Sequence, residues 1–292
     1  MEISLSNPML EVRVAEHGAE LQGIMKNGRE YLWQGDPHFW GRRSPVLFPI
    51  VGRVYDDVYR YRGGEYRLGQ HGFARDMDFV LEGKGDDWAV YSLESSEETL
   101  RLYPCRFRLE AGYRLDGSSV IVTWRVENKD AERMHFQIGA HPAFYFPDLL
   151  STSGERGYFS FDNPGKLEYI SPVGKGCAGD ESYVLERDGN GMMPVTAGTF
   201  DCDTYIFQDS QLKRVTLHDR SGKPYVSLEF DAPLVALWSP TAKHADCPFV
   251  CIEPWYGRCD RYGYDGDFSG REWNQTLEPG EVFEGGYRIV IE

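Results

Sequence analysis

The stretch RFRLEAGYRLDGSSVIVTWRV (residues 106–126) decides the fold class of this chain. In its first half, apolar and polar side chains alternate, and the apolar ones are Phe107, Leu109, Ala111, Tyr113 and Leu115. This period of two is typical of a half-buried β-strand. Asp116-Gly117 is a turn signal, after which the alternation resumes. The stretch therefore predicts two antiparallel strands with one buried face and one face in water.

The same pattern recurs along most of the chain. Short alternating segments fill residues 2–33, 78–138 and 204–238, with turn signals between them. Only residues 95–102 have the pattern of a helical turn, whereas residues 36–53 and 148–199 are irregular. Many short strands with very little helix predict an all-β, mostly antiparallel fold, as a large sandwich or barrel. We expect residues 1–292 to form a single domain.

The composition limits the partners of the chain. The formal net charge of −15 argues against a nucleic-acid partner, because phosphate binding needs clustered lysine and arginine. It also disfavours an anionic membrane surface, and no segment approaches the ~18 consecutive apolar residues of a membrane helix. Six cysteines without a CxxC pair, and an N-terminus without a signal-peptide pattern, indicate a reduced, soluble, cytoplasmic protein. A neutral small-molecule ligand is compatible with all of this.

Two titratable residues stand where a proline interrupts a strand pattern. In QIGAHPAFYF (residues 137–146), a proline follows His141, whose ring titrates near neutral pH. In FVCIEPWYG (residues 249–257), Glu253 ends an apolar segment and also precedes a proline. His141 is also compatible with a structural histidine at a strand end, and Glu253 with an ion pair to Arg258. A carboxylate in so apolar a context requires a partner, which makes Glu253 the sharper candidate.

Weaker candidates lie on loops, at strand ends or at aromatic positions; they are His71, Arg53, Asp203, Trp238, Trp255 and Phe144. His71 lies between glycines, which is typical of a loop, whether exposed or in contact with a ligand. Arg53 follows a glycine in an irregular segment, and Asp203 begins a strand, where a carboxylate often only caps a turn. The three aromatic residues are suited to stack on a ring-shaped ligand, but each alone is also typical of core packing.

The sequence lacks the motifs of several other chemistries. His244, Cys247, Cys251 and Cys259 are close in sequence. Their spacing matches no zinc finger, and Cys251 shares a strand face with Glu253, so we expect no metal site here. There is no dinucleotide-binding or phosphate-binding loop, no nucleophile elbow and no HExxH. The remaining candidates suit proton transfer to and from a neutral polyol, because they offer an acid and a base with different pKa ranges.

Four motifs in order resemble the aldose 1-epimerase (galactose mutarotase-like) family, most of all its LacX-type branch. They are LFPIVGR (47–53), QHGFAR (70–75), GAHPAF (139–144) and CIEPWYG (251–257), and the similarity continues to WNQTLEPGEVFEGGYRI (273–289). Each motif is short, but four in order at suitable separations are specific. The resemblance implies a β-supersandwich, consistent with the strand pattern, and an isomerase that interconverts the α and β anomers of a free aldohexose.

The resemblance also implies a role for each polar candidate. Glu253 matches the general base that takes the proton from the anomeric O1 hydroxyl, and His141 matches the general acid that protonates the ring oxygen O5. His71 matches a second histidine that assists at the ring oxygen, and Arg53 and Asp203 match contacts to sugar hydroxyls. The family implies no metal and no organic cofactor. We expect the partner to be a small aldose sugar and the chain to be a monomer or weak homodimer.

Three alternatives remain open. A hexose-6-phosphate 1-epimerase would use the same catalytic residues with a basic cluster for the phosphate, for which Arg42, Arg43 and Arg75 are candidates. A carbohydrate-binding protein without catalysis would not need both the histidine and the glutamate. A glycoside hydrolase needs two carboxylates on either side of the bond, and only one position is convincing. The sequence does not decide which aldose is used; we expect the loops at residues 36–46 and 148–199 to set it.

Overall fold

The computed structural model describes residues 1–150 and 154–292, and in them every ladder between named strands is antiparallel. The largest sheet has nine strands in the order β18-β15-β20-β21-β25-β11-β10-β9-β8. They are β8 (Val80–Lys84), β9 (Trp88–Glu94), β10 (Phe107–Asp116), β11 (Ser119–Asn128), β15 (Gly157–Phe161), β18 (Met193–Val195), β20 (Arg214–His218), β21 (Pro224–Phe230) and β25 (Val282–Ile291).

A second sheet has the order β17-β16-β19-β22-β23-β13-β5, with β14 also paired to β23. Its strands are β5 (Val46–Leu47), β13 (Ile138–Ala140), β14 (Ala143–Tyr145), β16 (Glu168–Ile170), β17 (Tyr183–Val184), β19 (Tyr205–Phe207), β22 (Leu234–Trp238) and β23 (Phe249–Tyr256). We call it the site sheet, because the candidate residues gather on it.

The remaining strands form smaller sheets. A four-stranded sheet contains β1 (Glu2–Ser6), β2 (Glu11–Ala15), β3 (Leu21–Lys26) and β4 (Arg29–Glu30). Two ribbons pair β6 (Val58–Tyr61) with β7 (Gly64–Arg67) and β12 (Met134–Phe136) with β24 (Gln275–Leu277). Short 3-10 helices cover Tyr55–Asp57, Ala74–Asp76, Pro147–Leu150, Pro240–Ala242 and Phe268–Gly270.

The strand pair predicted from residues 106–126 is confirmed. β10 and β11 pair from Phe107↔Asn128 to Asp116↔Ser119. Along β10 the apolar side chains are buried, whereas the arginines and glutamate between them are exposed or half-buried. One face of the nine-stranded sheet is therefore apolar and needs a covering layer.

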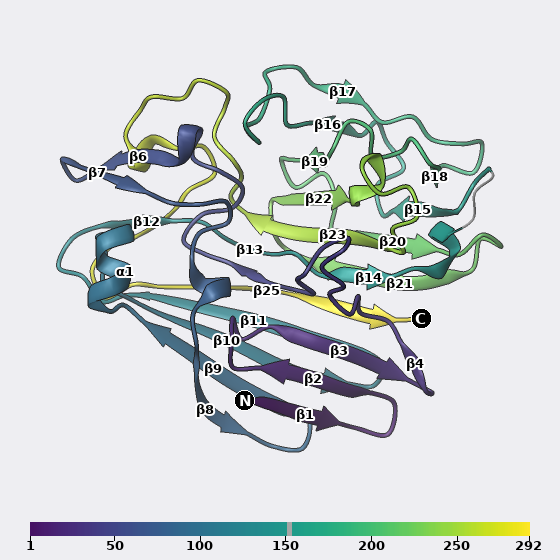
Figure 1. Ribbon diagram of the computed structural model, residues 1–292, viewed down its shortest axis with the longest axis horizontal. Helices are drawn as coiled ribbons and strands as arrows, with labels where there is room; N and C mark the ends of the chain where they lie inside the picture. Colours follow the sequence, from purple (N-terminus) through teal and green to yellow (C-terminus); the bar gives the residue numbers. More distant parts are fainter. Residues whose placement is uncertain (151–153) are drawn as a thin grey trace.

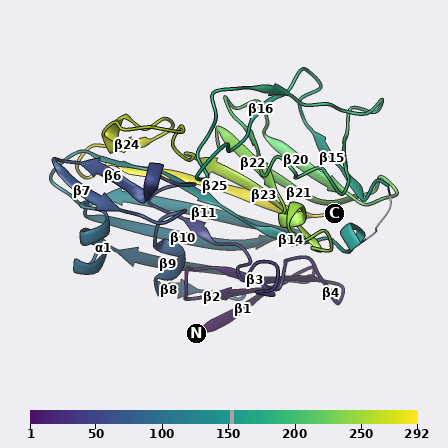
Figure 2. The same cartoon turned by 45° about the horizontal axis from the view of Figure 1, so that its top comes forward.

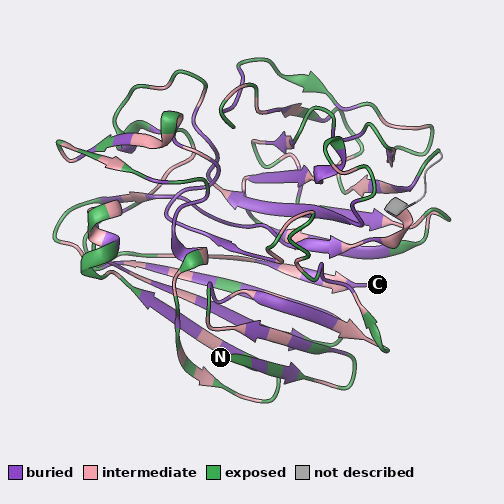
Figure 3. Ribbon diagram, in the orientation of Figure 1, coloured by how far each residue is buried: buried purple, intermediate pink, exposed green. Residues whose placement is uncertain are grey.

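Two sheets provide that layer. The main apolar core joins residues of the nine-stranded sheet to Val12 and Val14 of β2 and to Val250 and Ile252 of β23. Figures 1 and 2 show the purple strands β1–β4 near β8–β11, and the green strands β22 and β23 nearer to β20 and β21. Figure 3 shows the buried strands in the interior and the exposed residues in the outer loops. The core draws on residues from both ends of the sequence, and on this basis we propose a single domain.

The single predicted helical turn is confirmed as α1 (Glu97–Leu102). Ser96 caps it, because the Thr99 N–H donates to Ser96 Oγ (3.3 Å) and the Ser96 N–H donates to Thr99 Oγ1 (2.8 Å). None of the described helices is long and apolar enough to cross a membrane.

The prediction for residues 148–199 is wrong in part. This segment contains β15 and β18, which extend the nine-stranded sheet, and β16 and β17, which extend the site sheet. These strands have two to five residues each, too few for a recognisable alternation. Residues 151–153 of the segment lie outside the described residues.

Candidate active site

His141 and Glu253 are cross-strand neighbours on the outer face of the site sheet. β13 and β14 both pair with β23 in one common register, Gly139↔Trp255 before His141 and Ala143↔Cys251 after it. No residue is inserted between these two pairs, so His141 lies across from Glu253. The break in the ladder releases His141 from strand geometry without moving it away from its neighbour.

The prediction that Glu253 ends its strand is wrong. β23 continues through Pro254 to Tyr256, and β22 pairs along it, with Ala236 opposite Glu253 and Val235 opposite Pro254. The proline is tolerated because it removes only one N–H from the ladder. Glu253 is therefore held in the middle of a strand that has neighbours on both sides, and its position is rigid.

The two side chains meet in a buried environment. His141 Nε2 lies 3.2 Å from Glu253 Oε2, and the residues are 7% and 1% exposed. The contact lacks hydrogen-bond geometry, and among the described residues neither Glu253 Oε2 nor His141 Nδ1 has a hydrogen-bond partner. The alternative of an ion pair between Glu253 and Arg258 is wrong, because Arg258 pairs with Glu272.

Burial sets the charges of this pair. It raises the pKa of Glu253 well above its ordinary value, and the negative charge of Asp203 acts in the same direction. It lowers the pKa of His141 to about 3, and the positive charge of Arg75 adds to that effect. Both shifts favour the uncharged forms. A proton shared by the pair is therefore held by Glu253, while His141 is neutral.

His71 is fixed by a reciprocal pair of hydrogen bonds with Gly52. The Gly52 N–H donates to His71 Nδ1 (3.0 Å), and the His71 N–H donates to the Gly52 carbonyl (2.7 Å). Burial, followed by the charge of His141, lowers the pKa of His71 well below its ordinary value, so the ring is neutral. Because Nδ1 accepts a hydrogen bond, the ring proton is on Nε2, which acts as a donor. The rings of His71 and His141 are 5.5 Å apart, so the two motifs meet.

The backbone of Gly52 holds His71, and its conformation and close packing require a glycine. Replacing Gly52 therefore tests whether this contact positions His71. Its φ is +69°, and a Cβ atom there would lie 2.5 Å from Cys259 Cβ. We expect Gly52→Ala to lower the free energy of unfolding by about 1–2 kcal/mol for the left-handed backbone and by about 1–3 kcal/mol more for the clash. Denaturant unfolding measures this loss, and we also expect a lower catalytic rate because His71 loses its position.

Gly28→Ala is the matched control for this prediction. Gly28 has a similar φ of +75°, but a Cβ atom there meets nothing within 4 Å. The Gly28→Ala variant should lose only the backbone part of the free energy of unfolding and should keep its catalytic activity. Equal losses in the two variants would show that the contact with Cys259 does not matter.

A cavity of about 480 Å³ opens over this part of the site sheet. That volume is typical of small-molecule sites. His71, His141, Asp203, Trp238, Glu253 and Trp255 all line it. The Trp255 Nε1–H donates to the Ala140 carbonyl (3.2 Å), which fixes the indole ring beside the pair. Six of the eight predicted site residues, distant in sequence, are thus brought to one cavity.

The other two predicted residues do not line this cavity. The Nη1 group of Arg53 donates to both carboxylate oxygens of Asp57 (2.7 and 2.9 Å). The Arg53 side chain lies against Gly176, which does line the cavity. Phe144 is fully buried in the main core. Its predicted place in an aromatic platform is therefore wrong: side chains alternate along a strand, and Phe144 points to the face opposite Ala143.

Sequence reasoning missed much of the cavity wall, including Trp40. The Trp40 ring lies 4.6 Å from the His141 ring, and Trp238 packs edge-on against that ring at 5.4 Å. Trp40 belongs to the irregular segment 36–53, which gave only the signal of a cover over a site. Arg75 lines the cavity, although the sequence suggested it only for a phosphate group.

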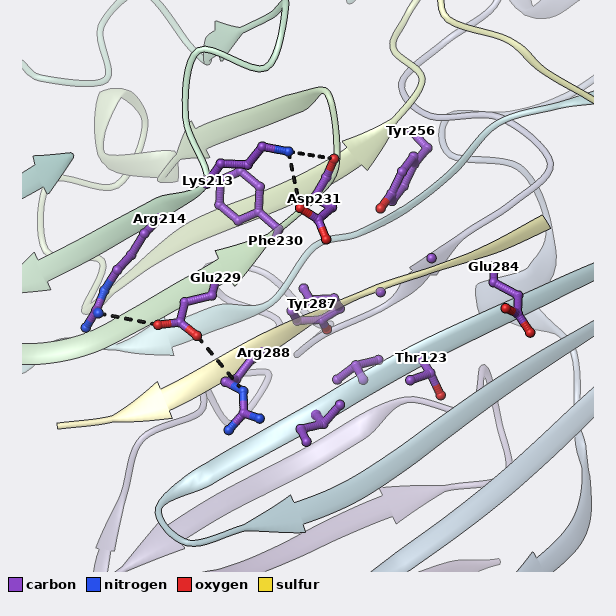
Figure 4. Close-up of a pocket in the computed structure, with 14 residues that line it drawn as sticks. Thr123, Lys213, Arg214, Glu229, Phe230, Asp231, Tyr256, Glu284, Tyr287 and Arg288 are labelled. Atoms are coloured by element: carbon purple, nitrogen blue, oxygen red, sulfur yellow. Dashed lines mark hydrogen bonds and ion pairs between the residues drawn. The ribbon is translucent and has the colours of Figure 1, made fainter. Parts of the chain in front are cut away.

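A shallower groove of about 730 Å³ lies on the nine-stranded sheet (Figure 4). Its cations are paired: Lys213 with Asp231 (3.2 Å), and Arg214 (3.3 Å) and Arg288 (4.0 Å) with Glu229. None of the described residues that line it is a histidine. The site-sheet cavity is therefore the better candidate for acid–base chemistry.

Comparisons with known proteins show what the whole chain is similar to. A family model described as aldose 1-epimerase matches residues 1–289. The protein LacX (plasmid) of Lactococcus lactis subsp. lactis is 31% identical over 268 residues, 88% of each chain. A galactose mutarotase related enzyme from Lactobacillus acidophilus is 33% identical with a TM-score of 0.92, covering 100% of this chain and 97% of that chain. A galactose mutarotase-like protein from Lactobacillus casei ATCC 334 is 27% identical, with a TM-score of 0.92 and 100% of both chains covered. The predicted β-supersandwich and the similarity to LacX are confirmed.

Proposed function

The chain belongs to the aldose 1-epimerase family, and we propose that it interconverts the α and β anomers of a free aldohexose. One observation carries this proposal: an imidazole nitrogen and a carboxylate oxygen lie 3.2 Å apart in a buried cavity large enough for a sugar. The two oxygens of a cyclic hemiacetal are bonded to the same carbon, C1. An acid and a base that act on both must therefore converge on a small region, as His141 and Glu253 do.

The proposed reaction moves one proton in and one proton out. In the form that opens the ring, the shared proton has moved from Glu253 to His141, whose Nε2 lies 3.2 Å from Glu253 Oε2. Glu253 then removes the proton of the O1 hydroxyl while His141 delivers its proton to O5, and the C1–O5 bond breaks. The products are a free aldehyde at C1 and a hydroxyl at C5. Rotation about the C1–C2 bond presents the other face of the aldehyde. Ring closure then returns both protons, with His141 as the base and Glu253 as the acid.

Neighbouring residues fit supporting roles. The Nε2–H of neutral His71 is a donor, which suits a ring oxygen because that atom only accepts hydrogen bonds. The prediction that Asp203 begins a strand is wrong, because β19 starts two residues later at Tyr205 and Asp203 lies in the preceding loop with φ +74°. Asp203 nevertheless lies in the cavity wall, where its carboxylate suits sugar hydroxyls. Trp238 and Trp255 offer flat apolar faces to the sugar ring. Arg53 is paired with Asp57. We propose that it contacts a sugar hydroxyl when the bound sugar replaces Asp57 as its partner.

The pH dependence of catalysis should be broad. The pair needs one proton between its two members, since one residue must accept and the other must donate. It gains a second proton only below the lowered pKa of His141, about 3, and it loses its only proton above the raised pKa of Glu253. We therefore expect kcat/KM to hold on the acid side until the pH approaches about 3, and its alkaline limb to lie well above the ordinary glutamate pKa of about 4.3. A narrow bell with limbs near the ordinary values of about 4.3 and 6.5 would contradict these shifts.

The activity itself is tested with freshly dissolved sugars. Polarimetry and NMR exchange spectroscopy on α-glucose and α-galactose should show a faster approach to anomeric equilibrium with the protein than without it. A protein that binds either sugar and leaves the exchange rate unchanged would be a carbohydrate-binding protein, and the proposal would be wrong.

One observation favours a second candidate function, a hexose-6-phosphate 1-epimerase. Arg75 lines the cavity, where its Nη2–H donates to the Gln70 carbonyl (2.6 Å) and its Nε lies 3.8 Å from Asp76 Oδ2. The other two arginines considered for a phosphate are engaged elsewhere, Arg42 with Asp76 (2.8 Å) and Arg43 with Gln22 (2.6 Å). A higher kcat/KM for glucose 6-phosphate than for glucose, lost in Arg75→Gln, would establish this function. Equal loss for both sugars would assign Arg75 to the common ring.

A further inference from the structure

Cys251 joins the catalytic pair in a three-residue cluster that the proposed reaction does not use. Cys251 and Glu253 are two residues apart on β23, so their side chains point to the same face. One ligand atom from each of His141, Cys251 and Glu253 lies within 4.8 Å of the other two. All three residues are buried. Such convergence of three donor groups from two strand segments is unusual in an apolar environment.

Two atoms of this cluster lack the partners that buried polar groups normally have. Among the described residues, His141 Nδ1 and Glu253 Oε2 make no hydrogen bond. Most buried polar atoms in proteins are satisfied, and exceptions are concentrated at functional sites. Glu253 Oε2 lies 3.2 Å from His141 Nε2 without forming a hydrogen bond, so a ligand that binds between the two side chains meets a free acceptor oxygen and a ring nitrogen beside it.

The donor set selects the kind of ligand. One imidazole nitrogen, one thiolate sulfur and one carboxylate oxygen are the groups that bind Zn²⁺. Ca²⁺ and Mg²⁺ require oxygen ligands in larger number. Zinc sites with three protein ligands keep a fourth position open for water. Here that position would face the cavity, since His141 and Glu253 both line it.

We propose that His141, Cys251 and Glu253 form a binding site for one Zn²⁺ ion, and that the bound ion blocks catalysis. Binding would displace two protons to solvent, one from the Cys251 thiol and one from the carboxyl group of Glu253, and would occupy the lone pairs of both catalytic residues. The blocking of catalysis rests on the function proposed above, whereas the binding of the ion does not. The site would make the enzyme sensitive to free zinc.

Calorimetry and cobalt absorption spectra test the site directly. Metal-free protein should bind one Zn²⁺ ion, and one Co²⁺ ion should give the near-ultraviolet band of a thiolate ligand. In Cys251→Ser we expect this band to disappear and Zn²⁺ affinity to fall more than about 10-fold, because even residues that only support metal ligands contribute about 10- to 100-fold. Glu253→Gln keeps the thiol and should also bind more weakly. Cys247→Ser is the matched control, because Cys247 is buried in the same small apolar cluster but is not part of the site.

Anomer exchange with added zinc tests the second half of the proposal. We expect Zn²⁺ to inhibit the wild-type protein and Cys247→Ser, and to spare Cys251→Ser, which should keep its activity in the absence of metal. Unchanged Zn²⁺ affinity in Cys251→Ser, or no thiolate band with Co²⁺, would overturn the site. Full exchange activity with zinc bound would overturn the block. If the wild-type protein catalysed no exchange, the proposed function would fail, while calorimetry would still decide the metal site.

Discussion

Replacing Glu253 with glutamine is expected to lower the rate of anomer exchange by about 10²- to 10⁴-fold. Glutamine has nearly the same shape but cannot accept the proton of O1, so the ring-opening step loses its base. Binding of the sugar should change far less than kcat, since the amide still offers a hydrogen-bond acceptor. NMR exchange spectroscopy measures the rate, and the thermal unfolding temperature checks that the variant is folded.

The fold should tolerate this change. Burial raises the pKa of Glu253 and so favours its uncharged form, which an amide resembles. We expect an unchanged or higher unfolding temperature. Glu284→Gln is a suitable control, because Glu284 lies in the groove of Figure 4 on the other sheet. Wild-type activity in Glu253→Gln, or an equal loss in Glu284→Gln, would remove the assignment of the base.

Replacing His141 with asparagine should have the second largest effect, a loss of about 10²-fold or more in kcat. The variant keeps a polar side chain between Trp40 and Trp238 but has no group that can deliver a proton to O5. His17→Gln is the control, since the His17 side chain is exposed and pairs with Asp78 (2.8 Å). Retention of more than half the wild-type rate in His141→Asn would exclude His141 as the acid.

The two residues should act as one unit. Residues that share a catalytic step show strongly non-additive losses. The double variant of His141 and Glu253 should therefore be no more than a few-fold slower than Glu253→Gln alone. Fully additive losses would mean that the residues act in separate steps.

The fold class followed from the sequence because β10 and β11 obey a simple rule. Each is long, half-buried and regular, so the alternation of side chains was visible. The strands inside residues 148–199 are short, and their pairing depends on partners far away in the chain. The sequence places the end of β23 too early, because Pro254 interrupts the strand pattern, whereas pairing with β22 continues through Pro254 to Trp255.

The site shows a similar division. His71, His141 and Glu253 were identified by motifs and by their sequence surroundings, and they meet in one cavity. Phe144 could have been excluded, because residues 141 and 144 are separated by an odd number and point to opposite faces of an extended chain. Trp40 left no such signal, since the position of a loop side chain depends on the tertiary structure.

In the sequence, Cys251 is close to His244, Cys247 and Cys259, whose spacing fits no metal site. The cluster that contains it is formed by the pairing of β13 and β14 with β23, which no local pattern reveals. Contacts between distant strands therefore decided both the catalytic pair and the proposed zinc site.

The central claim is that His141 and Glu253 act together on one hemiacetal carbon. A crystal structure of Glu253→Gln with a bound aldohexose tests it most directly. We expect the sugar in the site-sheet cavity, with O1 within about 2.6–3.2 Å of the residue 253 side chain and O5 at a similar distance from His141 Nε2. A sugar whose C1 faces away from both side chains, or one bound only in the groove beside Tyr287, would contradict the account.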